Sequence, residues 1–315
     1  MNRICQMLNL QLPVIQGGMG NISHPQLTAA VSNAGALGTI GAGTMSPAEI
    51  EEKIIKTKEL TSKPFALNIA ITVSPYTKEL VELAIKHDIS AVTFSAGNPA
   101  PYVPLLHAKG IKVMAVVGSV KHALKAEAAS VDIIIGEGYE AAGINSPLET
   151  TTLTLIPQLV DTVQVPVIAA GGIADGRGLA AMLALGAEGV QMGTRFIATK
   201  EAPYSEKYKQ RIIDAGDGDT IIVGRTVQRI RRVLKNPYTA HILQTEAKGL
   251  TPAEYDQLTD ESHHIIGAVH GDEDKGFWNS GQISGLIKEI PTVSELIQSM
   301  KTEMKLAIER LNHYS

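Results

Sequence analysis

The sequence predicts an α/β protein: a TIM-type (β/α)8 barrel with an added lobe of helices and loops after the eighth strand. Eight apolar runs of strand length alternate with segments that have helical periodicity. The runs begin about 20 to 35 residues apart, which is the size of one βα unit. After residue 200 the chain becomes more polar and this alternation ends. An open doubly wound sheet is the alternative, but no Gly-x-Gly-x-x-Gly motif follows the first run.

The expected strands are rich in Val, Ile and Ala, as suits strands that are buried on both faces. They are Val14–Gly18, Ala36–Gly43, Phe65–Ile71, Ala91–Gly97, Lys112–Gly118, Val131–Gly138, Val165–Gly172 and Gly189–Phe196. The helical segments between them are Pro25–Ser32, Pro47–Thr61, Thr77–His87, Tyr102–Lys109, Val120–Ala128, Thr150–Val163 and Gly176–Leu185. Ser46, Pro47 and Glu49 form the pattern of a capped helix start.

We divide the chain into a barrel over residues 1–200, an inserted lobe over 201–290 and a terminal segment over 291–315. The lobe begins with a helix at Tyr204–Ala215 and contains a loop-rich tract, and we expect it to lie over the active site. The terminal segment is an amphipathic helix, Val293–His313, capped by Thr292 or Ser294, which we expect to pack back on the barrel.

The amino-acid composition limits which partners and which cellular compartment we expect. The chain has 315 residues, of which 44% are hydrophobic, enough for a large core. Its net charge of −4 gives no basic surface, so we expect no nucleic-acid partner. Cys5, the only cysteine, excludes an internal disulfide, and we expect it to be a small buried hydrophobe. Without a membrane-length apolar run or a signal peptide, we expect a cytoplasmic protein with no membrane partner.

The stretch Val165–Phe196 carries a candidate phosphate site. Its first strand ends in Gly171-Gly172, and we expect its second strand to continue to Phe196 with an interruption at Gly193-Thr194. Glycine lets backbone amides approach an anion closely, and consecutive amides in a turn form a cradle for one. Two such turns on neighbouring parallel strands favour a phosphate ligand over two tight turns that merely need glycine.

Amides and hydroxyls dominate the other strand ends. Gln16, Asn68 and Gln191 stand at or near the ends of three expected strands. This set suits a polar heteroaromatic ring with a phosphate tail better than a metal ion, which needs clustered histidines or carboxylates. Gln16 and Asn68 can contact the edge of a flavin-like ring, or they can cap the strand ends.

Several motifs, in this order, resemble the nitronate monooxygenase (2-nitropropane dioxygenase) family. They are QGGM at 16–19, PFALN at 64–68, AGNP at 96–99, EGYEAAG at 137–143, VPVIAAGGIADGRG at 165–178 and GVQMGTRF at 189–196. Two further motifs extend the match, HGDEDKG at 270–276 and GQISGLI at 281–287. Together with the compact length, these motifs are most similar to the flavin-dependent bacterial enoyl-[acyl-carrier-protein] reductase branch.

The resemblance implies a TIM barrel that holds FMN non-covalently, with NAD(P)H as a candidate reductant. By position, it assigns the flavin phosphate to Gly171, Gly172, Gly193 and Thr194. It places the flavin ring near Gly17, Gly18, Met19, Asn68 and Glu137, with Gln282 close by. Gln191, at its strand end, is a further cofactor-binding candidate. The implied partner is a small-molecule or acyl-thioester substrate, and a homodimer is left open.

Two departures from the family pattern matter. Members usually carry a histidine in the loop after the EGxEAGG motif, and here Ile144 takes its place. A second histidine, usual a few residues after the GTRF strand, is replaced by Ser205. Neither side chain exchanges a proton near neutral pH. Asn145, Tyr139 and Ser205 remain as catalytic candidates, and His270 is the nearest substitute histidine.

These departures favour oxidation of alkyl nitronates with O2, because a nitronate arrives already deprotonated. The first alternative is an NAD(P)H-dependent enoyl-[acyl-carrier-protein] reductase of fatty-acid synthesis. That reaction needs a proton donor, whose loss costs about 10²–10⁴-fold in rate. The second is a flavin-binding protein with little turnover, because Ile144 replaces the histidine. A nucleotide-binding barrel in the manner of IMP dehydrogenase is disfavoured, because it needs a cysteine after the sixth strand.

Overall fold

The computed structural model describes residues 2–314 and contains the expected barrel. Its eight parallel strands form one sheet in the order β1-β9-β8-β6-β5-β4-β3-β2. A parallel bridge between Ile15 and Leu37 joins the two ends of this sheet. The strands are β1 (Val14–Gln16), β2 (Gly38–Gly41), β3 (Phe65–Ala70), β4 (Ala91–Ser95), β5 (Lys112–Val117), β6 (Ile133–Glu137), β8 (Val167–Ala170) and β9 (Gly189–Met192). The predicted (β/α)8 barrel is confirmed.

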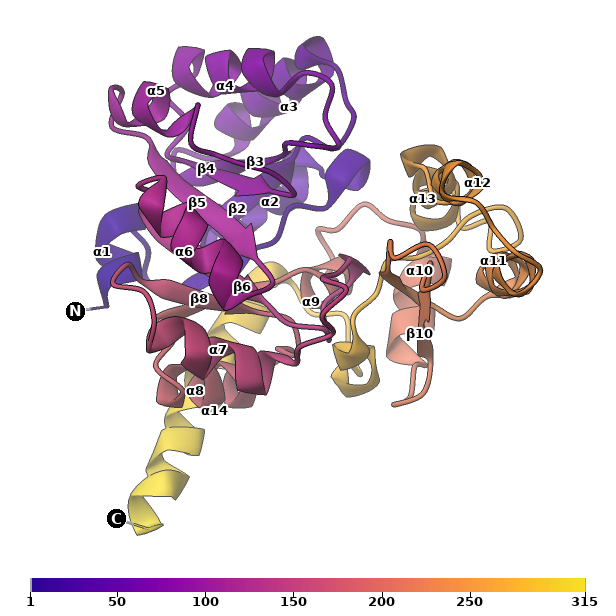
Figure 1. Cartoon of the computed structure of the whole chain (residues 1–315). Coiled ribbons are helices and arrows are strands. Elements are labelled where there is room, and N and C mark those ends of the chain that lie inside the picture. The colour runs from indigo at the N-terminus through magenta and orange to yellow at the C-terminus, as the bar shows by residue number, and fades with distance from the viewer. Residues whose placement is uncertain (1, 315) are drawn as a thin grey trace.

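Helices follow the strands as predicted and cover the outside of the barrel (Figure 1). They are α2 (Pro25–Asn33), α3 (Pro47–Leu60), α4 (Thr77–Lys86), α5 (Val103–His107), α6 (Val120–Ala128), α7 (Thr152–Val160) and α8 (Gly176–Ala184), with a short 3-10 turn, η1 (Gly20–Ile22), before α2. Local capping explains several of the starts. Ser46 accepts the Glu49 amide while the Glu49 carboxylate accepts the Ser46 amide, a complete capping box at α3.

A helix that the sequence pattern did not predict, α1 (Arg3–Leu8), precedes the first strand. Ile4 and Leu8 pack against inward-facing barrel residues such as Ile15 and Ile168. This contact closes the amino-terminal end of the barrel, so the cavity of the barrel opens only at the other end. Cys5 lies on the same helix and is only partly buried, so it is not the core residue that we expected.

The last barrel strand is shorter than predicted. We expected it to run over Gly189–Phe196, but β9 ends at Met192, and Thr194–Ile197 form the short helix α9. Gly193 separates the two elements. The residues of α9 are buried like those of a strand, and an apolar run alone does not distinguish a buried strand from a buried helical turn.

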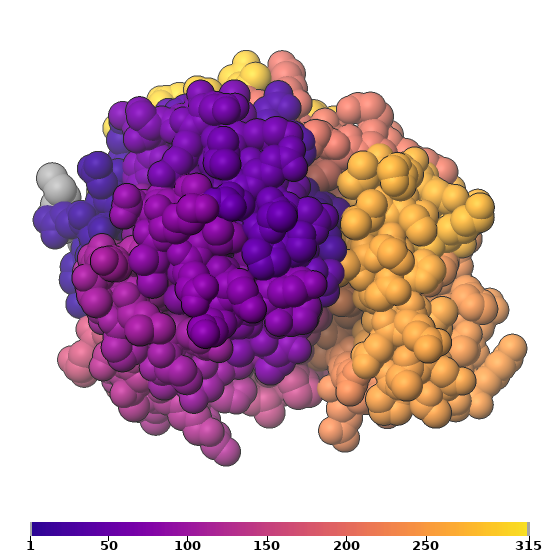
Figure 2. Space-filling view, turned by 90° about the horizontal axis from the view of Figure 1, so that it is seen from above, coloured from indigo at the N-terminus to yellow at the C-terminus, as the bar shows by residue number. Residues whose placement is uncertain are grey.

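We predicted a lobe of helices and loops, but the lobe also contains two strands. It includes α10 (Glu206–Ile213), β10 (Thr220–Val223), β11 (Arg231–Leu234), α11 (Pro237–Ala247), α12 (Pro252–Leu258), α13 (Glu261–Ala268) and the 3-10 turn η2 (Gln282–Leu286). The antiparallel strands β10 and β11 pair with each other, and β11 also pairs with β7 (Gly143–Ile144), which belongs to the loop after β6. Figure 2 shows the lobe, in orange, as a mass beside the violet barrel, with a furrow between them.

The terminal helix α14 (Val293–Leu311) packs along α8, and the turn η3 (Asn312–Tyr314) follows it. Of the two predicted caps, Thr292 is the one used, in a capping box with Glu295. Val293, Leu296, Ile297 and Met300 are buried, whereas the last turns of the helix project beyond the barrel (Figure 1). Within residues 2–314, no helix has both the length and the apolar character needed to cross a bilayer.

Candidate active site

A cavity of about 1070 Å³ opens at the carboxyl ends of the barrel strands. Loops of the barrel form most of its wall, and the lobe supplies the rest. Most of the predicted site residues line it: Gly17, Gly18, Met19, Asn68, Glu137, Asn145, Gly171, Gly172, Gln191, Gly193 and Thr194. Ligand sites usually measure about 300–1,000 Å³, so this cavity has room for a cofactor together with a substrate.

Four backbone amides gather in this wall without an acceptor among the described residues. They belong to Gly171 and Gly172, after β8, and to Gly193 and Thr194, after β9. Gly171 and Gly172 have φ of 92° and 76°, which turns successive amides into a concave anion-binding arrangement. A Cβ placed on Gly193 would meet nothing within 4 Å, so the space beside it belongs to the cavity. These residues fit a phosphate group.

The loop after β6 is held against this cradle by Glu140. The Glu140 carboxylate accepts the Thr152 amide at 2.9 Å and the Thr152 hydroxyl at 2.9 Å. A Cβ on Gly172 would lie 3.5 Å from Glu140 Oε1, so the carboxylate directly backs the cradle. Because hydrogen bonds from α7 take up its oxygens, Glu140 is tied to the protein rather than to the bound anion.

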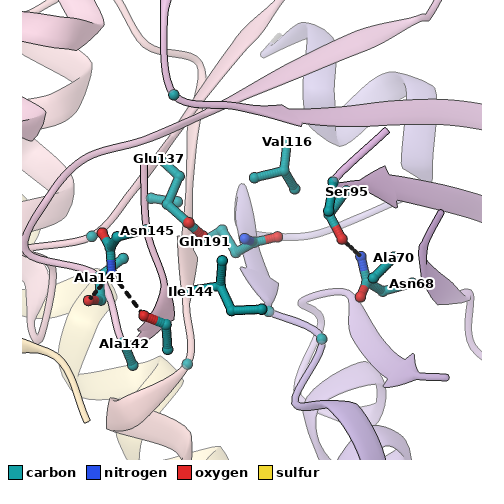
Figure 3. A pocket seen from close by; sticks show the side chains of 18 of the residues that line it. Asn68, Ala70, Ser95, Val116, Glu137, Ala141, Ala142, Ile144, Asn145 and Gln191 are labelled. Atoms are coloured by element: carbon teal, nitrogen blue, oxygen red, sulfur yellow. Dashed lines mark hydrogen bonds between the residues drawn. The ribbon is translucent and has the colours of Figure 1, made fainter. Parts of the chain in front are cut away.

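Asn68 and Gln191 stand at the strand ends, on the wall beside the cradle. A Cβ on Gly18 would lie 2.5 Å from Asn68 Oδ1, so only glycine lets the chain pass this close. Asn68 Nδ2 lies 3.4 Å from Ser95 Oγ, a contact visible in Figure 3. Gln16, in contrast, lies outside this wall. It is buried, and its Oε1 accepts the Thr39 amide at 3.3 Å, so it has the strand-capping role.

Glu137 is an acidic side chain on this wall, at the end of β6. Its carboxylate has no hydrogen-bond donor among the described residues, and desolvation raises its pKa from 4.5 to about 7. A carboxyl group with such a pKa holds its proton for part of the time at neutral pH. The pocket therefore contains a group that can give or take a proton.

The loop after β6 brings Ile144 and Asn145 to the pocket (Figure 3). Ile144, where the family histidine was expected, is 55% exposed and projects into the open space. Asn145 is buried, and its Nδ2 donates to the Ala141 and Gly143 carbonyls at 3.0 Å each. Asn145 thus fixes the shape of the loop with its amide nitrogen and has only its oxygen left for a ligand.

Four other predicted residues lie outside the pocket wall. The Tyr139 ring packs 4.5 Å from the Arg232 guanidinium, and its hydroxyl accepts from Arg225. Ser205 caps α10 by accepting the Tyr208 amide. Gln282 and His270 are exposed. Tyr139 and Ser205 are thus engaged with other parts of the protein rather than with the cavity.

The wall also includes four polar residues of the lobe that sequence reasoning missed: Arg231, Glu261, His264 and Asn279. We call them the polar cluster. Arg231 Nη1 donates to Asn279 Oδ1 at 3.2 Å, and Asn279 Nδ2 lies 3.4 Å from the His264 ring nitrogens. His264 Nδ1 lies 3.7 Å from Glu261 Oε2. Burial raises the pKa of Glu261, but the hydrogen bond to His264 and the charges of His264 and Arg231 outweigh it and lower the pKa to about 2.

No pattern in the sequence brings these four residues together. Asn279 lies between the two lobe motifs that carried the family resemblance, and Arg231 begins the short strand β11, half of which is arginine. His264 is at neither of the two positions where the family pattern has a histidine, so that pattern does not indicate it.

A (β/α)8 barrel with an amide cradle for a phosphate and an amide-lined wall beside it suits an enzyme whose ligand carries a phosphate group. A family model described as nitronate monooxygenase matches residues 2–74 and 67–303. The chain belongs to the nitronate monooxygenase family.

Proteins that are similar to this chain are named for different activities. A probable nitronate monooxygenase of Staphylococcus saprophyticus is 35% identical over 75% of this chain and 79% of its own. A 5-hydroxy-7a-methyl-1-oxo-octahydro-1H-indene-4-carboxyl-CoA dehydrogenase of Rhodococcus jostii is 32% identical over 98% of this chain and 96% of its own. The structure of FabK from Thermotoga maritima superposes with a TM-score of 0.94, at 39% identity over 100% of this chain and 99% of that chain.

Proposed function

We propose that the protein holds FMN and oxidises alkyl nitronates with O2. The amide cradle supports FMN as the particular flavin, because it presents one cluster of donors, as suits one phosphate group. Gly171, Gly172, Gly193 and Thr194 would hold the phosphate, and Gly18, Asn68 and Gln191 would border the ring. When bound, the flavin supplies two-electron oxidation of the substrate and transfer of the electrons to O2.

The observation that carries this proposal is the apolar side chain of Ile144. At 55% exposure it occupies the part of the pocket where the family usually has a histidine. A nitronate has already lost its proton, so its oxidation requires no base at that place. The chain's own residues have to bind the anion, orient it and keep bulk water out.

The test begins with the purified protein. We expect a yellow protein that releases FMN on denaturation, identified by its mass. Ethyl nitronate or propyl-2-nitronate should then cause oxygen consumption in an oxygen electrode at a rate well above that of free FMN. Oxygen uptake no faster than free FMN would disprove nitronate oxidation, and release of a different flavin would disprove the cofactor assignment.

A second candidate is NAD(P)H-dependent reduction of an enoyl thioester. Glu137 favours it, because a carboxyl group with a pKa of about 7 can donate the proton that this reaction needs. The full-length similarity to FabK is in line with it. Oxidation of NADH or NADPH that depends on crotonyl-CoA would support this activity. If it is the native one, Ile144→His should accelerate it, whereas Ile144→Gln, without a titratable group, should not.

A further inference from the structure

The guanidinium of Arg231 is buried in the pocket wall with little to neutralise it. The residue is 8% exposed, its Nε has no hydrogen-bond acceptor, and its Nη1 donates to the neutral amide oxygen of Asn279. In the described part of the chain, no carboxylate lies within 4.0 Å of it, although Glu261 is near enough to feel its charge. Burying a cation without an ion pair costs free energy of folding, unless a bound anion supplies the missing partner.

Strand pairing aims this cation at the space beside Ile144. Arg231 of β11 is the direct cross-strand partner of Ile144 of β7. Side chains of directly paired residues project from the same face of a sheet with their Cβ atoms about 4.5–5.5 Å apart. Both residues line the cavity. The guanidinium therefore faces the same part of the pocket that the exposed Ile144 side chain occupies.

The neighbouring arginine confirms this geometry by pointing the other way. Arg232 is paired with Gly143, and its Nε and Nη2 donate to the Tyr139 carbonyl at 3.1 and 3.0 Å. Its guanidinium also stacks on the Tyr139 ring, and the residue does not line the cavity. Of two adjacent arginines on one strand, one thus stabilises the loop and the other faces the pocket.

The rest of the polar cluster positions Arg231. Phe277 lies against two members of the cluster, with the Arg231 guanidinium 5.1 Å from its ring centroid and the His264 ring stacked at 5.4 Å. Asn279 bridges Arg231 and His264, and Glu261 Oε2 accepts the Asn21 amide at 3.3 Å. These contacts fix the guanidinium from the lobe side, and the residue also lines the cavity, where a ligand can reach it.

We propose that Arg231 binds the oxyanion of the substrate, a planar group with two oxygens such as a nitronate or a carboxylate. This rests on the proposed function for the position of the substrate, but not for the existence of the anion site. A guanidinium donates to two such oxygens at once, which orients the group as well as binding it. Ile144 on β7 carries no charge, so the cation beside it is supplied from the paired strand.

Anion binding tests this proposal separately from catalysis. Flavin-loaded protein is titrated with nitrate and with acetate at constant ionic strength, by calorimetry and by the flavin difference spectrum. We expect Arg231→Met to weaken binding about 10- to 150-fold, the effect of one lost hydrogen-bonded charge contact. Arg229→Met removes an exposed arginine that pairs with Asp256 on the surface, and should leave the affinity unchanged. Equal anion affinities of wild type and Arg231→Met would overturn the proposal.

A second variant does not depend on whether the pocket tolerates loss of the guanidinium. Ile144→Glu places a carboxylate opposite Arg231 on an exposed position, where it should pair with the guanidinium and abolish anion binding. Ile144→Gln, of the same shape and without charge, should retain binding within about threefold, because it leaves the guanidinium unpaired. If Ile144→Glu binds nitrate as tightly as Ile144→Gln does, Arg231 is not the anion contact.

The two proposals can fail independently. Wild-type protein that binds nitrate through Arg231 yet consumes no oxygen with nitronates would refute nitronate oxidation and support the anion site. Nitronate oxidation with the same KM in wild type and Arg231→Met would refute the anion site and support the proposed reaction.

Discussion

Glu137 gives the protein a pH dependence of stability that one substitution should remove. Its carboxyl group titrates near 7 in the folded chain, because the wall of the cavity desolvates it and no donor compensates. In the unfolded chain the pKa returns to 4.5. Replacing the carboxyl group by the neutral amide in Glu137→Gln keeps the shape of the side chain and eliminates the titration.

The sign of the effect follows from proton binding. Between pH 4.5 and about 7 the folded state holds a proton on Glu137 that the unfolded state has released, so stability falls as the pH rises. At 1.36 kcal/mol for each unit of pKa, the complete shift corresponds to about 3 kcal/mol. Water inside the cavity screens part of this, and we expect about 1–3 kcal/mol.

Urea denaturation of flavin-free protein at several pH values measures this term. The flavin is removed because a bound ligand adds its own stabilisation. Wild type and Glu137→Gln should have equal free energies of unfolding at pH 4.5. The variant should become progressively more stable than wild type up to pH 8, by about 1–3 kcal/mol. Other titrating groups cancel in this difference, since both proteins contain them.

A difference between the two proteins that stays constant from pH 4.5 to 8 would refute the reasoning. It would mean that Glu137 is ionised in the folded protein at the same pH as in the unfolded chain. A difference that grows toward low pH would mean that the folded state stabilises the carboxylate, which requires a donor that the structure does not place there.

Three further substitutions test the cradle, a helix cap and the barrel. Gly193→Val puts a side chain into open cavity and should weaken flavin binding at least about tenfold in a fluorescence titration, whereas Gly218→Val, also in open space but away from the pocket, should not. Unchanged flavin affinity of Gly193→Val would remove Gly193 from the cradle. Ser46→Ala should lower the free energy of unfolding by about 1 kcal/mol without affecting flavin binding, and no loss would mean that the capping box is not formed. Gly38→Ala would bring a Cβ within 2.0 Å of the Thr28 carbonyl oxygen, so we expect a loss of about 3 kcal/mol or more, and a stably folded variant would contradict the packing of α2 on β2.

The barrel could be predicted because its signals are local. Each strand run and each helical segment is defined by residues a few positions apart, as in β3 or in the capping box at Ser46. The same reliance on local pattern produced the error at β9, where the buried turn after Gly193 has the composition of a strand. The glycines at 171, 172 and 193 were found for the same reason, since backbone requirements select glycine directly.

The polar cluster could not be predicted, because it depends on pairing between distant parts of the chain. Nothing in the residues around Arg231 indicates that β11 pairs with the loop after β6, or that Arg231 lies opposite Ile144. The sequence showed that Ile144 replaces the family histidine, but not that Arg231 lies beside Ile144 in space. Only the three-stranded sheet of the lobe brings these side chains together.

That sheet also connects the barrel to the lobe at the rim of the pocket. Gly143 and Ile144 follow the barrel strand β6 in the chain, but they pair with β11 of the lobe. A tilt of the lobe would therefore carry the rim with it and change the width of the entrance. A ligand bound both by the glycine turns of the barrel and by Arg231 would hold the barrel and the lobe in one relative position. Occupation of the pocket would therefore also make the protein more rigid.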